Sequence, residues 1–169
     1  MTRVRPHPLP DHALLHAYTR NGSYTDCFAT DVTAPVSHAQ YVEAFYTTWV
    51  FKLERWILRW AVARPSTDEQ ARCLAAGALD KFAAWSVEQR ANNQLLMCDY
   101  MGRTRSWLMT APLPRGGTRL YFGSAVVPVR DKRPGEPKLG RSYSLLLGFH
   151  KLYSRVLLWA AARRLTSRA

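Results

Sequence analysis

Three side chains have types and placements that could serve acid–base chemistry. Asp26 lies in a strand-like segment, and His150 and Tyr153 lie in the last helical segment. A histidine within hydrogen-bond reach of a buried carboxylate can act as a general base. Lone histidines on such helices are mostly packed and hydrogen-bonded, so the sequence favours a non-enzymatic protein and leaves catalysis as the alternative.

Metal and thiol chemistry are weakly supported. His12 and His16 have the i, i+4 spacing that can place two imidazoles on one helix face, but they complete no known metal-binding signature. Cys27, Cys73 and Cys98 form no Cys-x-x-Cys pair and have no adjacent basic activator, so we expect inert thiols. The residues therefore predict no metal site and no cofactor.

The first part of the chain predicts one strand and a long helix. Tyr24–Val32 alternates as a strand does. The capping box Ser37-x-x-Gln40 begins a helix whose apolar spacing continues to Arg64. Such a helix would be about 40 Å long at 1.5 Å per residue, which is long for a small domain. We therefore expect a bend, at Thr47-Thr48.

A second helix and a meander of strands follow. The capping box Ser66-x-x-Glu69 begins the shorter helix, and Gly77 is expected just after its end. Short turn signals then separate strand-like segments, which indicates antiparallel hairpins. These segments are Phe82–Arg90, Gln94–Tyr100, Arg103–Ala111 and Thr118–Val129.

The last helical segment, Ser142–Leu165, is apolar over most of its circumference, which is typical of a helix buried on two sides. The chain is thus expected to be an α+β protein, with a curved antiparallel sheet wrapped around this C-terminal helix. We expect an N-terminal extension over 1–22, a single domain over 23–165 and a basic tail over 166–169.

This order of elements resembles the helix-grip fold of the START, birch-pollen-allergen and polyketide-cyclase-like superfamily. The stretches YTDCFATDV, AFYTTWVFKLERWIL and RTRSWL…GTRLYFGSAVVP look like those of uncharacterised bacterial proteins of this kind. The superfamily usually has six strands after its helices, whereas the sequence predicts four. The resemblance implies that an apolar or amphipathic small molecule binds beneath the C-terminal helix. It implies no particular reaction, and a cyclase or hydrolase on the same fold is the enzymatic alternative.

The strand pattern identifies side chains that would line such a pocket. In the last strand, Leu120, Phe122 and Ser124 share the face expected to point inward. If Trp107 also points inward, Arg105 could bind a carboxylate or phosphate head group. The alternative is a rim arginine paired with Asp99 or Glu88. The expected ligand-binding residues are Trp85, Arg105, Trp107, Phe122, Phe149 and Tyr153.

The chain carries an excess of positive charge. It has 24 Lys and Arg against 12 Asp and Glu, a net charge of +12, which attracts anionic partners. Tryptophans beside Lys52, Arg55 and Arg59, together with the basic 130–169 region, make an anionic membrane surface an alternative partner. The residues do not favour nucleic acid, because no helix-turn-helix, zinc-finger or RNP-type signature is present.

Targeting signals are not evident. Prolines 6, 8 and 10 interrupt the position of a secretory apolar run. The longest apolar run near the C-terminus, Val156–Ala162, is far shorter than the roughly 20 residues that span a bilayer. We therefore expect a cytoplasmic protein, with a peripheral position at the membrane as the alternative.

Overall fold

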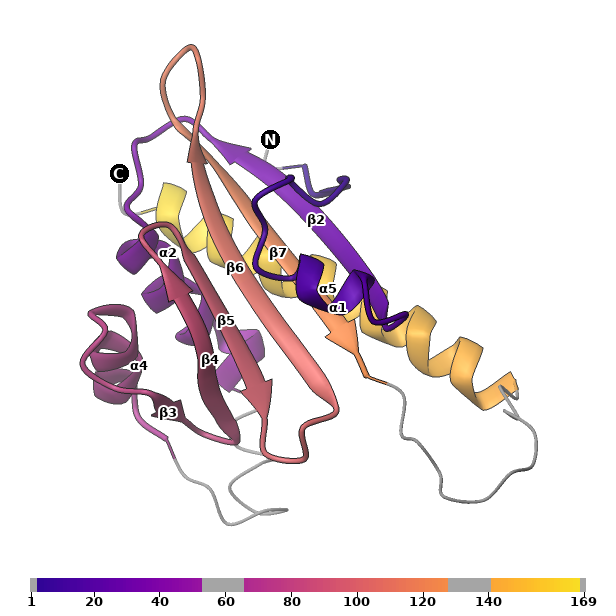
Figure 1. Ribbon diagram of the computed structural model, residues 1–169. Coiled ribbons are helices and arrows are strands. Elements are labelled where there is room, and N and C mark those ends of the chain that lie inside the picture. Colours follow the sequence, from indigo (N-terminus) through magenta and orange to yellow (C-terminus); the bar gives the residue numbers. More distant parts are fainter. Residues whose placement is uncertain (1–2, 53–65, 128–140, 168–169) are drawn as a thin grey trace.

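The computed structural model describes residues 3–52, 66–127 and 141–167, without the side chains of 141–151. It is an α+β structure with a seven-stranded antiparallel sheet and a long C-terminal helix (Figure 1). The strands are β1 (Arg5–Pro6), β2 (Tyr24–Val32), β3 (Lys81–Phe82), β4 (Trp85–Ala91), β5 (Gln94–Asp99), β6 (Thr104–Pro112) and β7 (Thr118–Val126). The helices are α1 (His16–Thr19), α2 (His38–Tyr46), α4 (Asp68–Ala75) and α5 (Arg141–Thr166).

The sheet has the strand order β1-β2-β7-β6-β5-β4-β3. Hairpins join β4 through β7, as the turn signals predicted, with a bulge in β4 between Val87 and Gln89. The β2 strand has the predicted bounds and pairs with β7 along its whole length. At the β6–β7 turn Gly117 has a φ of +86°, and a Cβ there would lie 2.4 Å from the Val32 carbonyl oxygen. Only glycine fits this turn against the end of β2.

The long helix predicted from Ser37 begins and bends where the sequence indicates. Ser37 and Gln40 form the capping box, with the Gln40 N–H 3.2 Å from Ser37 Oγ. The α2 helix ends at Tyr46, and helical backbone resumes at 49–52. At the break, the Thr47 hydroxyl donates to the Glu43 carbonyl at 2.6 Å, a bond that competes with the helix ladder. The remainder of the predicted helix, 53–65, lies outside the described residues.

Three local predictions are wrong in detail. The second capping box is formed by Thr67 and Gln70, one residue later than predicted, because both pairs fit the same motif. The segment predicted as one strand over Phe82–Arg90 is broken into β3 and β4, and Ala83 has a φ of +51° at the break. The apolar spacing that predicts the long helix includes Trp49, yet Trp49 is 66% exposed whereas Val50 and Phe51 are buried, because the bend shifts the phase of the helix that follows.

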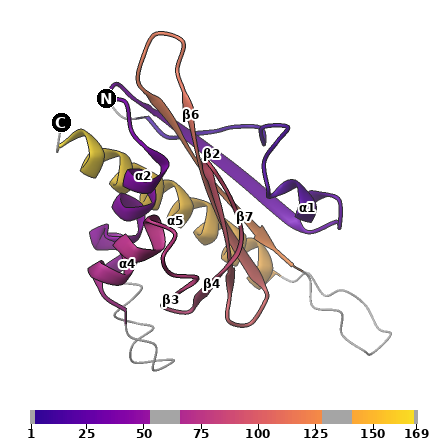
Figure 2. The same ribbon diagram turned by 60° about the vertical axis from the view of Figure 1, so that its left-hand side comes forward.

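Helices cover one face of the sheet, called here the inner face. Figure 2 shows α2, α4 and α5 on this side and α1 on the other. The core includes Phe45 of α2, Leu108 of β6, Phe122 of β7 and Leu158 of α5. Leu120 and Phe122 belong to this core, and Ser124 lines a cavity on the same side, so the prediction that these three residues share the helix-covered face is confirmed. Among the described residues, no helix combines the length and apolar character needed to cross a membrane.

The N-terminal residues cover the opposite, outer face of the sheet. Leu15 packs against Trp107 and other buried side chains of this face in a second core. Buried Gln94 holds the segment: its Oε1 accepts from Leu14 N–H and from Trp107 Nε1–H, both at 2.9 Å, and its Nε2 donates to the His12 carbonyl at 3.0 Å. The segment expected as an extension over 1–22 thus contributes a strand and a core to the fold.

Candidate functional site

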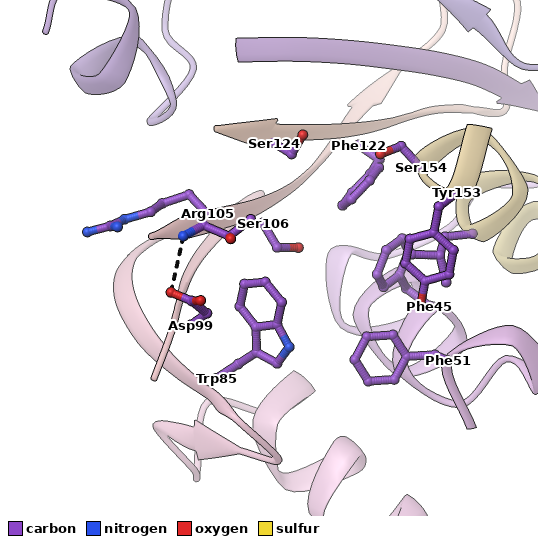
Figure 3. Close-up of a pocket in the computed structure, with 12 residues that line it drawn as sticks. Phe45, Phe51, Trp85, Asp99, Arg105, Ser106, Phe122, Ser124, Tyr153 and Ser154 are labelled. Carbon is purple, nitrogen blue, oxygen red and sulfur yellow. Dashed lines mark hydrogen bonds between the residues drawn. The ribbon is translucent and has the colours of Figure 1, made fainter. Parts of the chain in front are cut away.

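A cavity of about 220 Å³ lies between the inner face of the sheet and the helices. Its apolar wall consists of Phe45 and Phe51 from the helical side, Trp85 and Phe122 from the sheet, and Leu157 from α5. The rings of Phe45 and Phe122 are 4.9 Å apart between centroids, and those of Phe45 and Phe51 are 6.2 Å apart. Aromatic rings thus meet in the cavity from α2, from 49–52 and from β7 (Figure 3).

The other side of the cavity is polar because adjacent strands place hydroxyl groups side by side. Ser106 of β6 is directly opposite Ser124 of β7, and both line the cavity. The Ser124 hydroxyl donates to Asp26 of β2 at 2.5 Å. Thr104 of β6 adds a third hydroxyl from the strands, whereas Ser154 of α5 lies beside Phe122 (Figure 3). This row can exchange hydrogen bonds with the polar end of a bound molecule.

Asp99 supplies a carboxylate at the end of β5, where the chain turns into β6. Its Oδ1 accepts hydrogen bonds from the backbone N–H groups of Arg103 at 2.7 Å and Thr104 at 3.1 Å. Asp99 lies across from Trp85 in the strand pairing, and both line the cavity (Figure 3). The two backbone bonds fix the carboxylate beside the aromatic wall.

Only some of the six residues expected to bind a ligand are found to line the cavity. Trp85, Phe122 and Tyr153 line the cavity. The orientation expected for Trp107 is wrong: it is fully buried in the outer-face core, because neighbouring Ser106 and Leu108 face inward. Both faces of β6 are covered, so the alternation of side chains along the strand could not distinguish the inner face from the outer face. The side chain of Phe149 lies outside the described residues.

Arg105 forms part of the cavity wall, but its guanidinium extends away from the cavity (Figure 3). Its Nε donates to Tyr18 Oη at 2.7 Å and to Glu88 Oε2 at 3.0 Å, and its side chain is only 13% exposed. Tyr18 also donates to Glu88. Burial, with the Glu88 hydrogen bond, raises the pKa of Tyr18 to about 12. The alternative in which Arg105 pairs with Glu88 is confirmed, and the guanidinium serves to dock α1 on the outer face.

The residues proposed for catalysis are only partly described. Asp26 binds Ser124, Tyr153 lines the cavity, and the side chain of His150 lies outside the described residues. The enzymatic alternative therefore stays a prediction. Burial raises the pKa of the Cys27 thiol to about 12 and also raises that of the Cys98 thiol, which favours the protonated form of both.

The structure also places some of the residues weighed above as metal ligands or as the alternative lipid contact. Within the described ranges, no group of three or more His, Cys, Asp or Glu side chains could hold a metal ion. His16 Nε2 lies 3.0 Å from the Pro10 carbonyl oxygen. Lys52 forms an ion pair with Asp68 at 2.6 Å, which engages one basic residue of the proposed lipid contact. Arg55, Arg59 and 130–140 lie outside the described residues.

No protein-family model, curated protein or solved structure matches the chain. Sequence reasoning missed several residues that line the cavity. Phe45 has the helical spacing of a core residue, and nothing in that spacing distinguishes a cavity wall from a filled core. Ser106 and Asp99 gave no signal, because their placement depends on the strand register. The missed lining residues are Phe45, Phe51, Asp99, Thr104, Ser106, Ser154 and Leu157.

A second, wider hollow of about 590 Å³ lies near the turn between β6 and β7, and His38 at the start of α2 lines it. The His38 ring Nε2 lies 3.4 Å from the Leu108 carbonyl oxygen. Burial lowers the pKa of His38, and the charge of Arg90 lowers it further. The folded protein therefore resists protonation of this ring.

This pKa shift predicts a pH dependence of stability. The unfolded chain, with an ordinary histidine pKa of about 6.5, binds a proton more readily than the folded chain, so acidification through that range favours unfolding. We expect the free energy of unfolding to fall less between pH 7.5 and pH 5 in His38→Gln than in the wild type, as measured by urea denaturation. An equal fall in both proteins would contradict a lowered pKa of His38. The matched control is His12→Gln, which removes a histidine from an exposed position.

Proposed function

We propose that the protein binds a small amphipathic molecule in the cavity between its sheet and its C-terminal helix. The observation that carries the proposal is the division of one cavity into an aromatic wall and a hydroxyl-bearing wall. Phe45, Phe51, Trp85 and Phe122 would contact the apolar part of the ligand. Mostly apolar cavities with a few converging polar groups are typical of small-molecule sites.

A helix-grip type of architecture is part of this proposal. The β2 strand pairs with β7, the helices α2 and α4 lie between β2 and the meander in sequence, and α5 packs against β2, β7 and α2. This arrangement supports the resemblance stated from the sequence. Among the described residues, the five strands β3 to β7 follow these helices, compared with the usual six and with the four that the sequence predicted.

The size and polarity of the cavity restrict the ligand. Its volume of about 220 Å³ is below the ~300–1,000 Å³ common for drug-sized ligands, which favours a smaller molecule. The charged side chain offered by the described lining is Asp99, since the Arg105 guanidinium turns away. Both backbone bonds to Asp99 use Oδ1, so Oδ2 can accept a hydrogen bond from a ligand. A hydroxyl or ammonium end therefore fits better than the carboxylate or phosphate head group expected from Arg105.

Native mass spectrometry combined with thermal denaturation tests the proposal. We expect a co-purified small mass, or a rise in melting temperature with medium-chain alkyl alcohols and amines that exceeds the rise with the matching carboxylates. Ser106→Phe would place a ring in the cavity and abolish both effects, whereas Thr33→Phe, at an exposed position, would leave them unchanged.

The failing outcomes are distinct. Wild-type protein that carries no added mass and is not stabilised by any of the three probe classes would overturn the proposal. Stabilisation that survives in Ser106→Phe would show that the probes bind elsewhere.

A further inference from the structure

The outward face of α5 carries a stripe of alternating apolar and basic side chains. Its members are Leu152, Arg155, Trp159 and Arg163, all exposed and spaced three or four residues apart. Such spacing places them in one line along the helix, over a length of about 16 Å. Leu152 is 60% exposed and Trp159 is 37% exposed. We refer to these four residues as the α5 stripe.

Packing of the helix fixes the direction of the stripe. Ser154, Leu157, Leu158 and Ala161 are buried on the opposite side, where α5 contacts β2, β7 and α2. The α5 stripe therefore points away from the sheet and the cavity. Leu152 and Trp159 thus add two large apolar side chains to the same exposed helix face as Arg155 and Arg163, and the combination of the two kinds of side chain is the feature to be explained.

The electrostatics of the stripe select an anionic partner. Residues 137–169 contain no Asp or Glu, so α5 carries no internal acid to neutralise its arginines. In the part of the chain that the structure describes, the ion pairs found involve neither Arg155 nor Arg163. The Arg163 guanidinium lies over the Trp159 ring, 5.1 Å from its centroid. The stacked pair presents an apolar surface and a positive charge at the same point.

We propose that the α5 stripe docks on the surface of an anionic phospholipid bilayer. A helix that lies in the membrane interface buries tryptophan and leucine at the boundary between head groups and acyl chains, while arginines bind the phosphates. Tryptophan in particular is enriched at that depth. A nucleic acid would engage the two arginines but leave Leu152 and Trp159 in water, so it explains only half of the stripe. This inference is independent of the cavity and of its ligand.

Flotation of the full chain with lipid vesicles tests the proposal. We expect binding to phosphatidylglycerol–phosphatidylcholine vesicles at low salt, loss of that binding at high salt, and little binding to phosphatidylcholine alone. Arg155→Gln with Arg163→Gln should weaken binding roughly 25-fold, since each basic residue near an anionic surface contributes roughly fivefold. The control, Arg20→Gln with Arg115→Gln, removes the same charge from exposed positions elsewhere and should change binding much less.

The depth of Trp159 provides a second measurement. Brominated lipids should quench part of the tryptophan emission of the bound wild type, and Trp159→Phe should lose that part. The proposal is overturned if anionic vesicles do not bind at low salt, if both double variants weaken binding equally, or if quenching is the same in Trp159→Phe. It is also overturned if duplex DNA binding, but not vesicle binding, depends on Arg155 and Arg163.

Discussion

Gln94→Leu is expected to lower the free energy of unfolding by about 3 kcal/mol or more. Leucine keeps the bulk of the side chain but removes the acceptor for the N–H groups of Leu14 and Trp107 and the donor for the His12 carbonyl. Each buried polar group left without its partner costs about 1–3 kcal/mol. Urea denaturation followed by circular dichroism measures the loss.

The same substitution at an exposed position isolates the cause. Gln89→Leu on β4 should change stability by no more than about 0.5 kcal/mol, because that side chain is exposed. The N-terminal segment should also detach more readily in Gln94→Leu, so trypsin should cleave faster after Arg20. Equal stability of the two variants would mean that Gln94 does not hold the segment on the outer face.

Phe45→Ala is expected to cost about 3–5 kcal/mol and to enlarge the cavity. Phe45 is 1% exposed, and its ring contacts those of Tyr41, Tyr46, Phe51 and Phe122. Removal of the ring deletes the centre of this aromatic cluster, and dense packing limits how far the neighbours can move into the space. Thermal and urea denaturation of the ligand-free protein measure the cost.

The variant also tests whether the cavity sets the size of the ligand. If Phe45 forms its wall, bulkier alkyl probes should stabilise Phe45→Ala more than they stabilise the wild type. The difference in melting temperature, with and without each probe, measures this. Phe82→Ala removes an equally buried ring that does not line the cavity, so it should lose stability without any change in preferred probe size. A change of preferred probe size in both variants would contradict the assignment of Phe45 to the cavity wall.

Much of the fold was predictable where the signal is local. The bounds of β2, the capping box at Ser37, the bend at Thr47-Thr48 and the turn glycines depend on residues close in sequence. Local motifs fail when two registers fit equally well, as at Ser66 and Thr67, or when tertiary packing breaks a strand, as at Ala83. The meander was therefore predicted in order but not in strand number.

The candidate site was less predictable because it depends on which face of each strand is inside. The β6 strand has apolar side chains on both faces, so the inward position of Leu108 and the outward position of Trp107 are decided by what covers the sheet. The outer cover comes from residues near the N-terminus, held by bonds from Gln94 across about 80 sequence positions. Periodicity carries no information on such distant pairing. It therefore identified three of the cavity aromatics and, of the polar wall, only Ser124.

The short outer strands have a consequence for the behaviour of the protein at high concentration. A long strand at the edge of a sheet offers unpaired backbone groups to which another chain can add a strand, and this is a route to aggregation. Here the outer strands β1 and β3 are two residues long, and Pro6 in β1 has no N–H to donate. The short β3 leaves part of β4 at the edge of the sheet, and the bulge at Glu88 distorts that part of β4. The β4 side of the sheet is therefore a poor template for another strand. On the other side β1 pairs with only two of the nine residues of β2, so strand addition at high concentration should occur at the β2 edge.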